Sequence, residues 1–236
     1  MKVKLFNIEI DALSMRQTLD IVEDAVANDK HIHHTVVNAG KIVLMQEDKE
    51  LEKSVNEADL INADGQAVVW ASKMLGSPLP ERVSGIDLME KLVKRSFEKG
   101  YRCYFLGAEE DVVSNLITLY KKKYSNNVIA GYRNGYFKKS DEKRIAKVIS
   151  QSNANILFVA ITSPKKEIFL NTYKKELKNI NFIMGVGGSF DVIAGKVNRA
   201  PKWMQDIGFE WLYRVIQEPR RMFMRYLVGN TKFIYL

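Results

Sequence analysis

The sequence is short of cysteine and has no long hydrophobic run. Its one cysteine, Cys103, cannot form a disulfide within one chain, which fits a reducing compartment such as the cytoplasm. Because Cys103 lies in an apolar run, we interpret it as a small buried core residue. The longest apolar run, 156–161, is much too short for a membrane-spanning helix, and residues 1–6 lack the apolar stretch of a secretory signal. We therefore expect any membrane contact to be peripheral.

Two common phosphate-binding signatures are also absent. The segment from Gly185 to Asp191 reads GVGGSFD, but Phe190 stands where the third glycine of Gly-x-Gly-x-x-Gly would be, and no Gly-Lys-Ser/Thr follows as in a P-loop. Glycines still allow backbone amides to approach a diphosphate closely. The candidate substrate-binding residues of this segment are Gly185, Gly187, Gly188 and Asp191.

The three histidines, His31, His33 and His34, do not complete a recognisable metal site. No cysteine stands nearby to add a ligand, and no Asp-x-Asp pair follows a predicted strand. We interpret the cluster as the solvent-facing start of a strand. We expect neither a metal nor another cofactor.

What the sequence does contain is an alternation of apolar strands and amphipathic helices. Hydrophobic residues make up 46% of the chain and charged residues 27%, which is ordinary for a globular protein. A strand or hairpin arm is predicted at 3–10, and helical patterns separate further strands at 34–37, 58–63, 101–106, 128–130, 156–161 and 182–186. This order predicts an α/β fold, a Rossmann-like and mostly parallel sheet with helices on both faces.

The alternation stops near Gly195, where the composition changes. Residues 196–236 hold eight basic residues against three acidic ones, and two of the three tryptophans. Two amphipathic helical patterns follow, from Asp206 to Gln217 and from Pro219 onward. We predict one domain over 1–195 and a basic, amphipathic helical C-terminal appendage over 196–236. The appendage suits a phosphate-rich or membrane-surface partner, and equally a packed helical pair with solvated arginines.

Polar residues follow several predicted strands, at the edge where parallel α/β sheets bind ligands. Asp64 comes directly after the strand at 58–63. A carboxylate there can act as a general base toward a hydroxyl group, although Asp64-Gly65 is also a common turn pair. Arg82 lies in a loop ahead of a predicted helix. Arginine and a helix N-terminus both favour phosphate, although a surface arginine is the simpler interpretation.

Several short motifs, each weak alone, occur together along the chain. They are Ala63-Asp64-Gly65, Arg82-Val-Ser-Gly85-Ile-Asp87, Ser163-Pro164-Lys165-x-Glu167, Gly185-Val-Gly-Gly-Ser-Phe-Asp191-Val-Ile-Ala-Gly195, Arg199-Ala-Pro201-Lys-Trp203, Glu210-Trp211-Leu-Tyr213-Arg214 and Glu218-Pro219-Arg220-Arg221. In this order and spacing the motifs resemble the WecG/TagA/CpsF family of bacterial glycosyltransferases, and the resemblance covers residues 3–226.

The resemblance implies an inverting glycosyltransferase that needs no metal. Its donor would be a UDP-sugar, and its acceptor a polyprenyl-diphosphate-linked N-acetylglucosamine (GlcNAc). In the branch that builds wall teichoic acid, N-acetylmannosamine (ManNAc) moves from UDP-ManNAc to the 4-hydroxyl of GlcNAc-diphospho-undecaprenol. The enzyme would be cytoplasmic and peripheral on the inner face of the cell membrane. Residues 1–195 would then be the catalytic domain and 196–236 the membrane-association appendage.

The resemblance also assigns roles to individual residues. Asp64 matches the general base, Asn38 a pocket residue near it, and Arg82 a substrate-binding arginine. The appendage arginines that match those proposed to meet the diphosphate are Arg214, Arg221 and Arg225.

Three positions depart from the family pattern, and one of them is Thr162, which stands where the family has a glycine before Ser163-Pro164. Val36 replaces a threonine that the family has two residues before Asn38, and Thr35 would face the other side of the strand. Lys166 stands where the family has a glutamine. Its ammonium could contact the carboxylate of a mannosaminuronic acid donor or a phosphate, or it could be solvated. The donor therefore stays open between UDP-ManNAc, UDP-N-acetylmannosaminuronic acid and UDP-glucose.

Two other classes of protein remain as alternatives. A nucleotide-binding oxidoreductase would share the alternating strands and the glycine-rich loop, but it needs the missing Gly-x-Gly-x-x-Gly. A nucleic-acid binder would use the basic C-terminal segment. The arginines there alternate with apolar residues at helical spacing, which favours an anionic membrane surface. We therefore expect a membrane partner and no nucleic acid, and we leave a homo-oligomer open.

Overall fold

The computed structural model describes residues 1–236, apart from the side chains of Arg221, Met222 and Arg225. A parallel sheet of six strands, in the order β4-β3-β8-β7-β5-β6, forms its centre, and an antiparallel hairpin of two strands stands beside it. The strands are β1 (Lys2–Leu5), β2 (Ile8–Asp11), β3 (Ile32–Val37), β4 (Leu60–Ala63), β5 (Cys103–Gly107), β6 (Ile129–Arg133), β7 (Ile156–Ala160) and β8 (Phe182–Gly185). The predicted α/β fold is confirmed.

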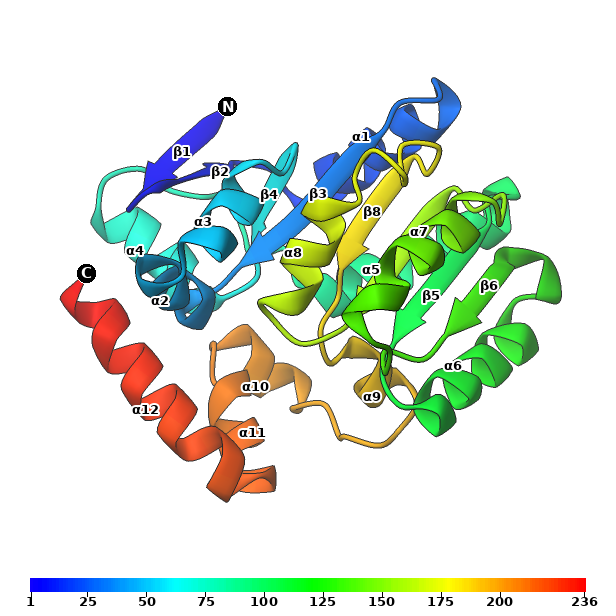
Figure 1. Cartoon of the computed structure of the whole chain (residues 1–236). Helices are drawn as coiled ribbons and strands as arrows, with labels where there is room; N and C mark the ends of the chain where they lie inside the picture. The colour runs from blue at the N-terminus through cyan, green and yellow to red at the C-terminus, as the bar shows by residue number, and fades with distance from the viewer.

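Helices connect the strands and follow the last one. They are α1 (Met15–Ala27), α2 (Ala39–Glu47), α3 (Lys49–Asn56), α4 (Gln66–Met74), α5 (Gly85–Lys99), α6 (Glu110–Lys123), α7 (Glu142–Ser150), α8 (Lys165–Thr172), α9 (Ser189–Ile193), α10 (Lys202–Asp206), α11 (Glu210–Gln217) and α12 (Pro219–Tyr235), with short 3-10 turns at Asn126–Val128 and Lys139–Asp141. Figure 1 shows α10, α11 and α12 below the sheet, on the side to which the strand arrows point.

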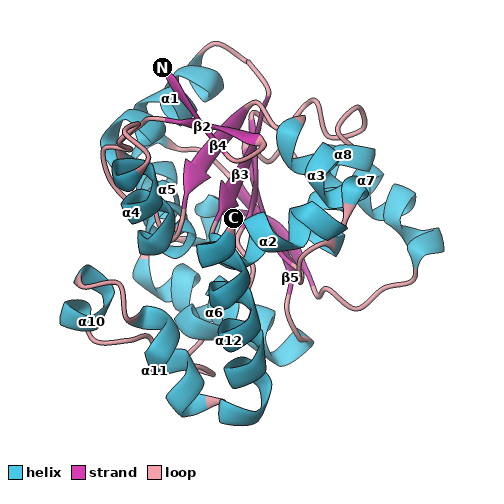
Figure 2. Cartoon of the chain, turned by 90° about the vertical axis from the view of Figure 1, so that its left-hand side faces the viewer, coloured by secondary structure: helices cyan, strands magenta, loops and turns pink.

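The sheet is covered on both faces, as its apolar strands predicted. All residues of β5 and β7 are buried, which is typical of central parallel strands with helices on each side. One core cluster packs the sheet against α1, α5 and α6, and another packs it against α7 and α8. Figure 2 shows α1 and α5 on one side of the sheet and α3, α7 and α8 on the other. A third cluster joins the hairpin to α2, α3 and α4.

The C-terminal helices differ in detail from the expectation. The helical pattern predicted from Asp206 to Gln217 is divided, because Gly208 adopts a positive φ of 76°, which a continuing helix cannot accommodate. Pro219 begins α12 as expected. This helix packs against α2 and α11, and Phe233 near its end is buried in the core cluster, with its ring 5.4 Å from that of Phe6. The appendage is therefore docked on the α/β core.

The apolar side chains of α11 and α12 are only partly covered by the core. Phe223, Met224 and Leu227 are each more than half exposed, as is Ile216 of α11. In the described part of the chain, no helix combines the length and the hydrophobicity that crossing a membrane requires.

Candidate active site

Asp64 lies at the carboxyl end of β4, between two elements of the core. Its backbone N–H donates to the carbonyl of Val37 at the end of β3 (2.8 Å). Its side chain is partly buried, and Oδ1 accepts a hydrogen bond from the N–H of Gly85 in the first turn of α5 (3.1 Å). Gly85 lies close to the carboxylate, since a Cβ there would be in van der Waals contact with Asp64 Oδ2 at 3.8 Å. The fold thus points the carboxylate at a helix N-terminus.

Opposing influences set the pKa of Asp64. Burial raises it from the usual range to about 6, while the charge of Arg82 and the hydrogen bond from Gly85 act to lower it. Glu210 raises the pKa further and Arg214 lowers it. A carboxyl with this pKa is mostly ionised at neutral pH, and it is a stronger base than an ordinary aspartate.

Glu210 of the appendage contacts two arginines whose charges act on Asp64. Arg82 Nη1 lies 3.2 Å from Glu210 Oε2, and Arg214 Nη2 lies 3.8 Å from Glu210 Oε1. Arg82 and Glu210 are 128 positions apart in the sequence. The structure thus brings together three of the predicted site residues, Asp64, Arg82 and Arg214. Glu210 had no predicted role, although it stands in one of the motifs that carry the family resemblance.

A second ion pair between core and appendage lies close by. The guanidinium of Arg199 donates twice to the carboxylate of Asp87, at 2.6 and 2.8 Å. Burial alone would raise the pKa of Asp87, but the hydrogen bonds and charge of Arg199 hold it below its usual range. Asp87 belongs to the first turn of α5, the helix whose Gly85 contacts Asp64. The pair therefore anchors the start of the appendage next to the candidate base.

Asn38 lies beside Asp64, but its side chain is engaged in a structural hydrogen bond. Its Oδ1 accepts from the N–H of Lys41 (3.0 Å) and so caps the start of α2. A Cβ on Gly65 would lie 3.2 Å from the Cβ of Asn38. The glycine after Asp64 therefore allows the ends of β3 and β4 to meet closely.

Thr35 and Val36 face opposite sides of β3, as the strand periodicity predicted. The Thr35 hydroxyl accepts from Lys41 Nζ (3.3 Å). Val36 lies on the Asp64 side, since a Cβ on Gly85 would be 3.9 Å from Val36 Cγ2 and 3.8 Å from Asp64 Oδ2. The neighbourhood of Asp64 therefore contains an apolar side chain, that of Val36.

Lys166 belongs to a buried cluster of charged side chains, which also lies at the carboxyl ends of the strands. Lys166 Nζ lies 2.8 Å and Lys41 Nζ 2.6 Å from Glu167 Oε1. Burial would raise the pKa of Glu167, but the two ammonium groups outweigh it and lower the pKa to about 2. The Lys166 stem passes over Gly185, where a Cβ would be 3.0 Å from its Cδ. Sequence reasoning did not predict Lys41 or Glu167 as partners of Lys166.

The glycine-rich loop follows β8, the neighbour of β3. Gly187 has a φ of 53°, a conformation that favours glycine, and Gly188 precedes α9. The carbonyl of Asp191 accepts from the N–H groups of Lys196 (2.9 Å) and Val197 (3.1 Å), which turns the chain toward the appendage. The loop thus lies at the carboxyl ends of the strands, where the other predicted core residues also lie. Arg221 and Arg225 have side chains outside the described part of the structure.

The histidine prediction was wrong in one respect. His33 and His34 are buried in β3 rather than solvent-facing, and His34 Nε2 contacts Asn62 Oδ1 at 2.9 Å. Burial lowers the pKa of His33 to about 4 and that of His34 to about 3, which keeps both neutral. Among the described residues, no group of three or more His, Cys, Asp or Glu side chains is arranged to hold a metal ion.

Comparison with known proteins identifies the family. The sequence profile described as the glycosyl transferase WecG/TagA/CpsF family matches residues 3–236. The chain is similar to the N-acetylglucosaminyldiphosphoundecaprenol N-acetyl-beta-D-mannosaminyltransferase of Bacillus spizizenii, with 36% identity over 170 residues, 72% of this chain and 65% of the relative. It is also similar to the Bacillus subtilis protein of the same name, with 34% identity over 174 residues, 74% of this chain and 67% of the relative. The matched part spans about two thirds of the length of these relatives. The chain belongs to the WecG/TagA/CpsF family of glycosyl transferases.

Proposed function

We propose that this protein transfers ManNAc from UDP-ManNAc to the 4-hydroxyl of GlcNAc-diphospho-undecaprenol, with inversion at the anomeric carbon. The observation that carries the proposal is the Asp64 site. A carboxylate with a pKa of about 6 stands at a strand end, among arginines of both the core and the appendage. The names of the two relatives support N-acetylmannosamine as the transferred sugar and the lipid-linked GlcNAc as the acceptor.

In this mechanism Asp64 is the general base. Its carboxylate accepts the proton of the acceptor hydroxyl while that oxygen attacks the anomeric carbon. The bond from the anomeric carbon to the UDP oxygen breaks on the opposite face, so the configuration inverts. Because burial raises the pKa of Asp64, the carboxylate gains basicity while remaining ionised at neutral pH.

Fixed cations would stabilise the diphosphate as it leaves with growing negative charge. Arg82 and Arg214 share Glu210 as a partner, and a diphosphate oxygen can replace or join that carboxylate. The amides of Gly187 and Gly188 offer further donors at the same edge, together with Lys166 and the appendage arginines Arg221 and Arg225. In this scheme the appendage completes the site.

The exposed apolar residues of the appendage would bring the enzyme to its lipid-linked acceptor. Phe223 is 53% and Leu227 51% exposed on α12, and Ile216 of α11 is 67% exposed. Each nearby basic residue adds about 1 kcal/mol of attraction to an anionic leaflet. We therefore propose peripheral association with the inner face of the cell membrane.

A donor with a carboxylate is the second candidate, and Lys166 favours it. A lysine at this position can pair with the carboxylate of UDP-N-acetylmannosaminuronic acid. In the structure, however, Lys166 Nζ already contacts Glu167 at 2.8 Å. A uronic acid would therefore compete with an internal carboxylate, which ranks this donor below UDP-ManNAc.

A donor panel tests the proposal directly. The protein is incubated with UDP-ManNAc, UDP-N-acetylmannosaminuronic acid, UDP-glucose or UDP-GlcNAc, with or without a GlcNAc-diphosphate-lipid analogue, and UDP release is measured. We expect acceptor-dependent release from UDP-ManNAc above all other donors. Preference for the uronic acid would select the second candidate, and no acceptor-dependent release from any donor would refute the proposed reaction.

A further inference from the structure

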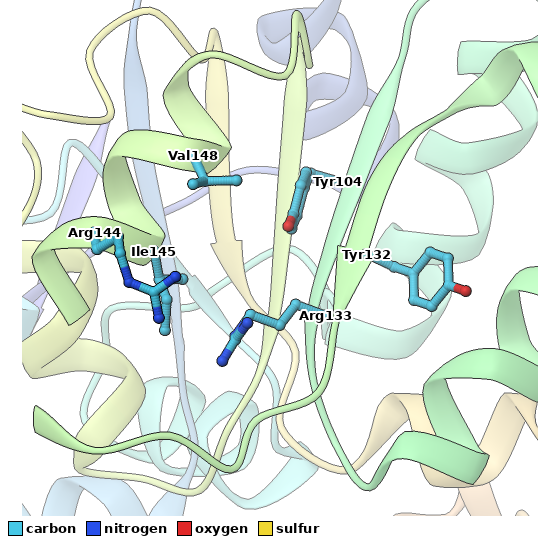
Figure 3. Close-up of a pocket in the computed structure, with 6 residues that line it drawn as sticks. All are labelled: Tyr104, Tyr132, Arg133, Arg144, Ile145 and Val148. Carbon is cyan, nitrogen blue, oxygen red and sulfur yellow. The ribbon is translucent and has the colours of Figure 1, made fainter. Parts of the chain in front are cut away.

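A cavity of about 110 Å³ lies at the β6 edge of the sheet, between β6 and α7 (Figure 3). Asp64 follows β4, which forms the opposite edge of the same sheet. The cavity is therefore separate from the candidate active site. The residues that line it are Tyr104, Tyr132, Arg133, Arg144, Ile145 and Val148.

A glycine on the edge strand makes room for one wall of this cavity. A Cβ on Gly131 would lie only 2.6 Å from Tyr104 Cε2, so the glycine lets the tyrosine ring approach β6 closely. Ile145, which is buried, and Val148 supply apolar side chains from α7. Figure 3 shows the ring of Tyr132 turned away from the other labelled side chains. The polar groups that remain are the Tyr104 hydroxyl and two guanidinium groups.

Arg133 is the central polar group. Within the described part of the chain its Nε is buried and has no hydrogen-bond partner. Its guanidinium carbon lies 6.0 Å from the centre of the Phe137 ring, and none of the ion pairs found among the described residues includes it. Leaving this buried N–H without a hydrogen-bond partner is unfavourable. Arg133 is therefore ready to accept an anionic partner from outside the chain.

Arg144 brings a second positive charge from the opposite wall. Its one acidic neighbour among the described side chains, Asp141, lies 3.3 Å away, and Arg144 is 67% exposed. Such a loose surface contact leaves part of the guanidinium available. In Figure 3 Arg133 extends toward the helix that carries Arg144. The surrounding segment, 133–147, has six basic and two acidic residues, so its charge also favours an anion.

We propose that this cavity binds a phosphate group between Arg133 and Arg144, with the Tyr104 hydroxyl as a third donor. Two planar guanidinium groups match the oxygens of a tetrahedral phosphate in geometry and charge. With about 110 Å³ of accessible space, the cavity has room for a small anion such as phosphate. Free phosphate and a small phosphate ester, such as a lipid headgroup, share this chemistry.

Calorimetric titration at constant ionic strength tests the proposal. Inorganic phosphate and glycerol 3-phosphate are titrated separately into the full-length protein, with chloride as the balancing anion. The variants are Arg133→Gln and Arg144→Gln, and the control is Lys147→Gln, which removes an exposed charge from α7 outside the cavity. We expect Arg133→Gln to weaken phosphate binding by about tenfold or more, Arg144→Gln to weaken it less, and Lys147→Gln to leave it unchanged.

The melting temperature of each variant in chloride alone shows whether it has kept its fold. Tighter binding of glycerol 3-phosphate than of phosphate would assign the site to an ester or headgroup, and the reverse order to free phosphate. The proposal is wrong if neither compound binds, or if folded Arg133→Gln binds both as tightly as the unmodified protein. Neither result depends on the identity of the transferred sugar.

Discussion

At the scale of single residues, burial and nearby positive charge have opposite effects on the pKa of the Asp64 carboxyl. Burial raises its pKa, and the charges of Arg82 and Arg214 together with the Gly85 N–H lower it. Sequence reasoning could find Asp64, because Asp-Gly after an apolar strand marks a strand end. It could not find Glu210 as a shared partner, since 128 positions separate Glu210 from Arg82. Long-range charge pairs leave no periodic signal in a sequence.

The pH profile of transfer reports on Asp64. Because the base must be ionised, kcat/KM should rise with pH through about 6 and level off above it. Replacing Arg82 with Gln removes a charge that lowers the pKa of Asp64, so this limb should move to higher pH. A profile that rises near pH 4, the range of an ordinary aspartate, would contradict the assignment. So would a limb that does not move in the Arg82 variant.

The buried cluster around Glu167 makes a prediction about stability. Glu167→Gln would leave two buried ammonium groups, Lys41 and Lys166, without the carboxylate they share. Such a change should reduce the free energy of unfolding by about 3–5 kcal/mol. Glu50→Gln in the exposed first turn of α3 is the control and should cost less than about 1 kcal/mol, since it removes only a favourable contact with the helix dipole. Urea denaturation checks both, and equal stability of the two variants would show that the cluster is not a structural element.

At the scale of elements, the strands were predictable and some helix boundaries were not. Apolar runs mark β5 and β7 because both faces of these strands are buried. Helix α3 was not predicted, since most of its residues are polar and only Leu51, Ser54 and Val55 are buried. The division between α10 and α11 was missed as well, because Gly208 has to fit against α4, and this contact exists only in the folded chain.

Gly208 allows the appendage to lie close to α4. It combines a φ of 76° with a tight approach, since a Cβ would lie 2.9 Å from Gln66 Cγ and 3.0 Å from Trp70. Gly208→Ala should destabilise the protein by about 1–2 kcal/mol through backbone strain and by about 1–3 kcal/mol through crowding. Gly195→Ala is the matched control, because Gly195 has a φ of 81° with nothing within 4 Å. Thermal unfolding should show a larger loss at position 208, and equal losses would contradict the close packing.

At the scale of the whole molecule, contacts spread along the appendage hold it on the core. Arg199 binds Asp87, Glu210 binds Arg82, and Phe233 enters the core cluster of the hairpin and α2. Between these anchors, apolar side chains of α11 and α12 remain exposed. The composition change near Gly195 indicated an appendage, and the domain boundary there stays a prediction. We propose that the same segment closes the site and contacts the membrane.

If the appendage both closes the site and contacts the membrane, substitutions on its exposed face should weaken membrane binding without changing UDP binding. Phe223→Ser combined with Leu227→Ser removes two exposed apolar side chains of α12 and should weaken sedimentation with anionic liposomes severalfold. UDP binding should be unchanged, because both side chains are about half exposed and neither belongs to a core cluster. The control is Leu119→Ser, an exposed position on α6, which should sediment normally. Equal sedimentation of the double variant and the control would exclude this face as the membrane contact.

The most direct test of the account is the Asp64→Asn variant. Product formation from UDP-ManNAc and the GlcNAc-diphosphate-lipid analogue is followed by mass spectrometry, and UDP binding by calorimetry. Asparagine keeps the shape of the side chain and its contact with Gly85, but it cannot accept the proton of the acceptor hydroxyl. The account predicts that transfer falls by about 100-fold or more while UDP binding and the melting temperature stay close to those of the unmodified protein. Transfer at the normal rate would contradict it.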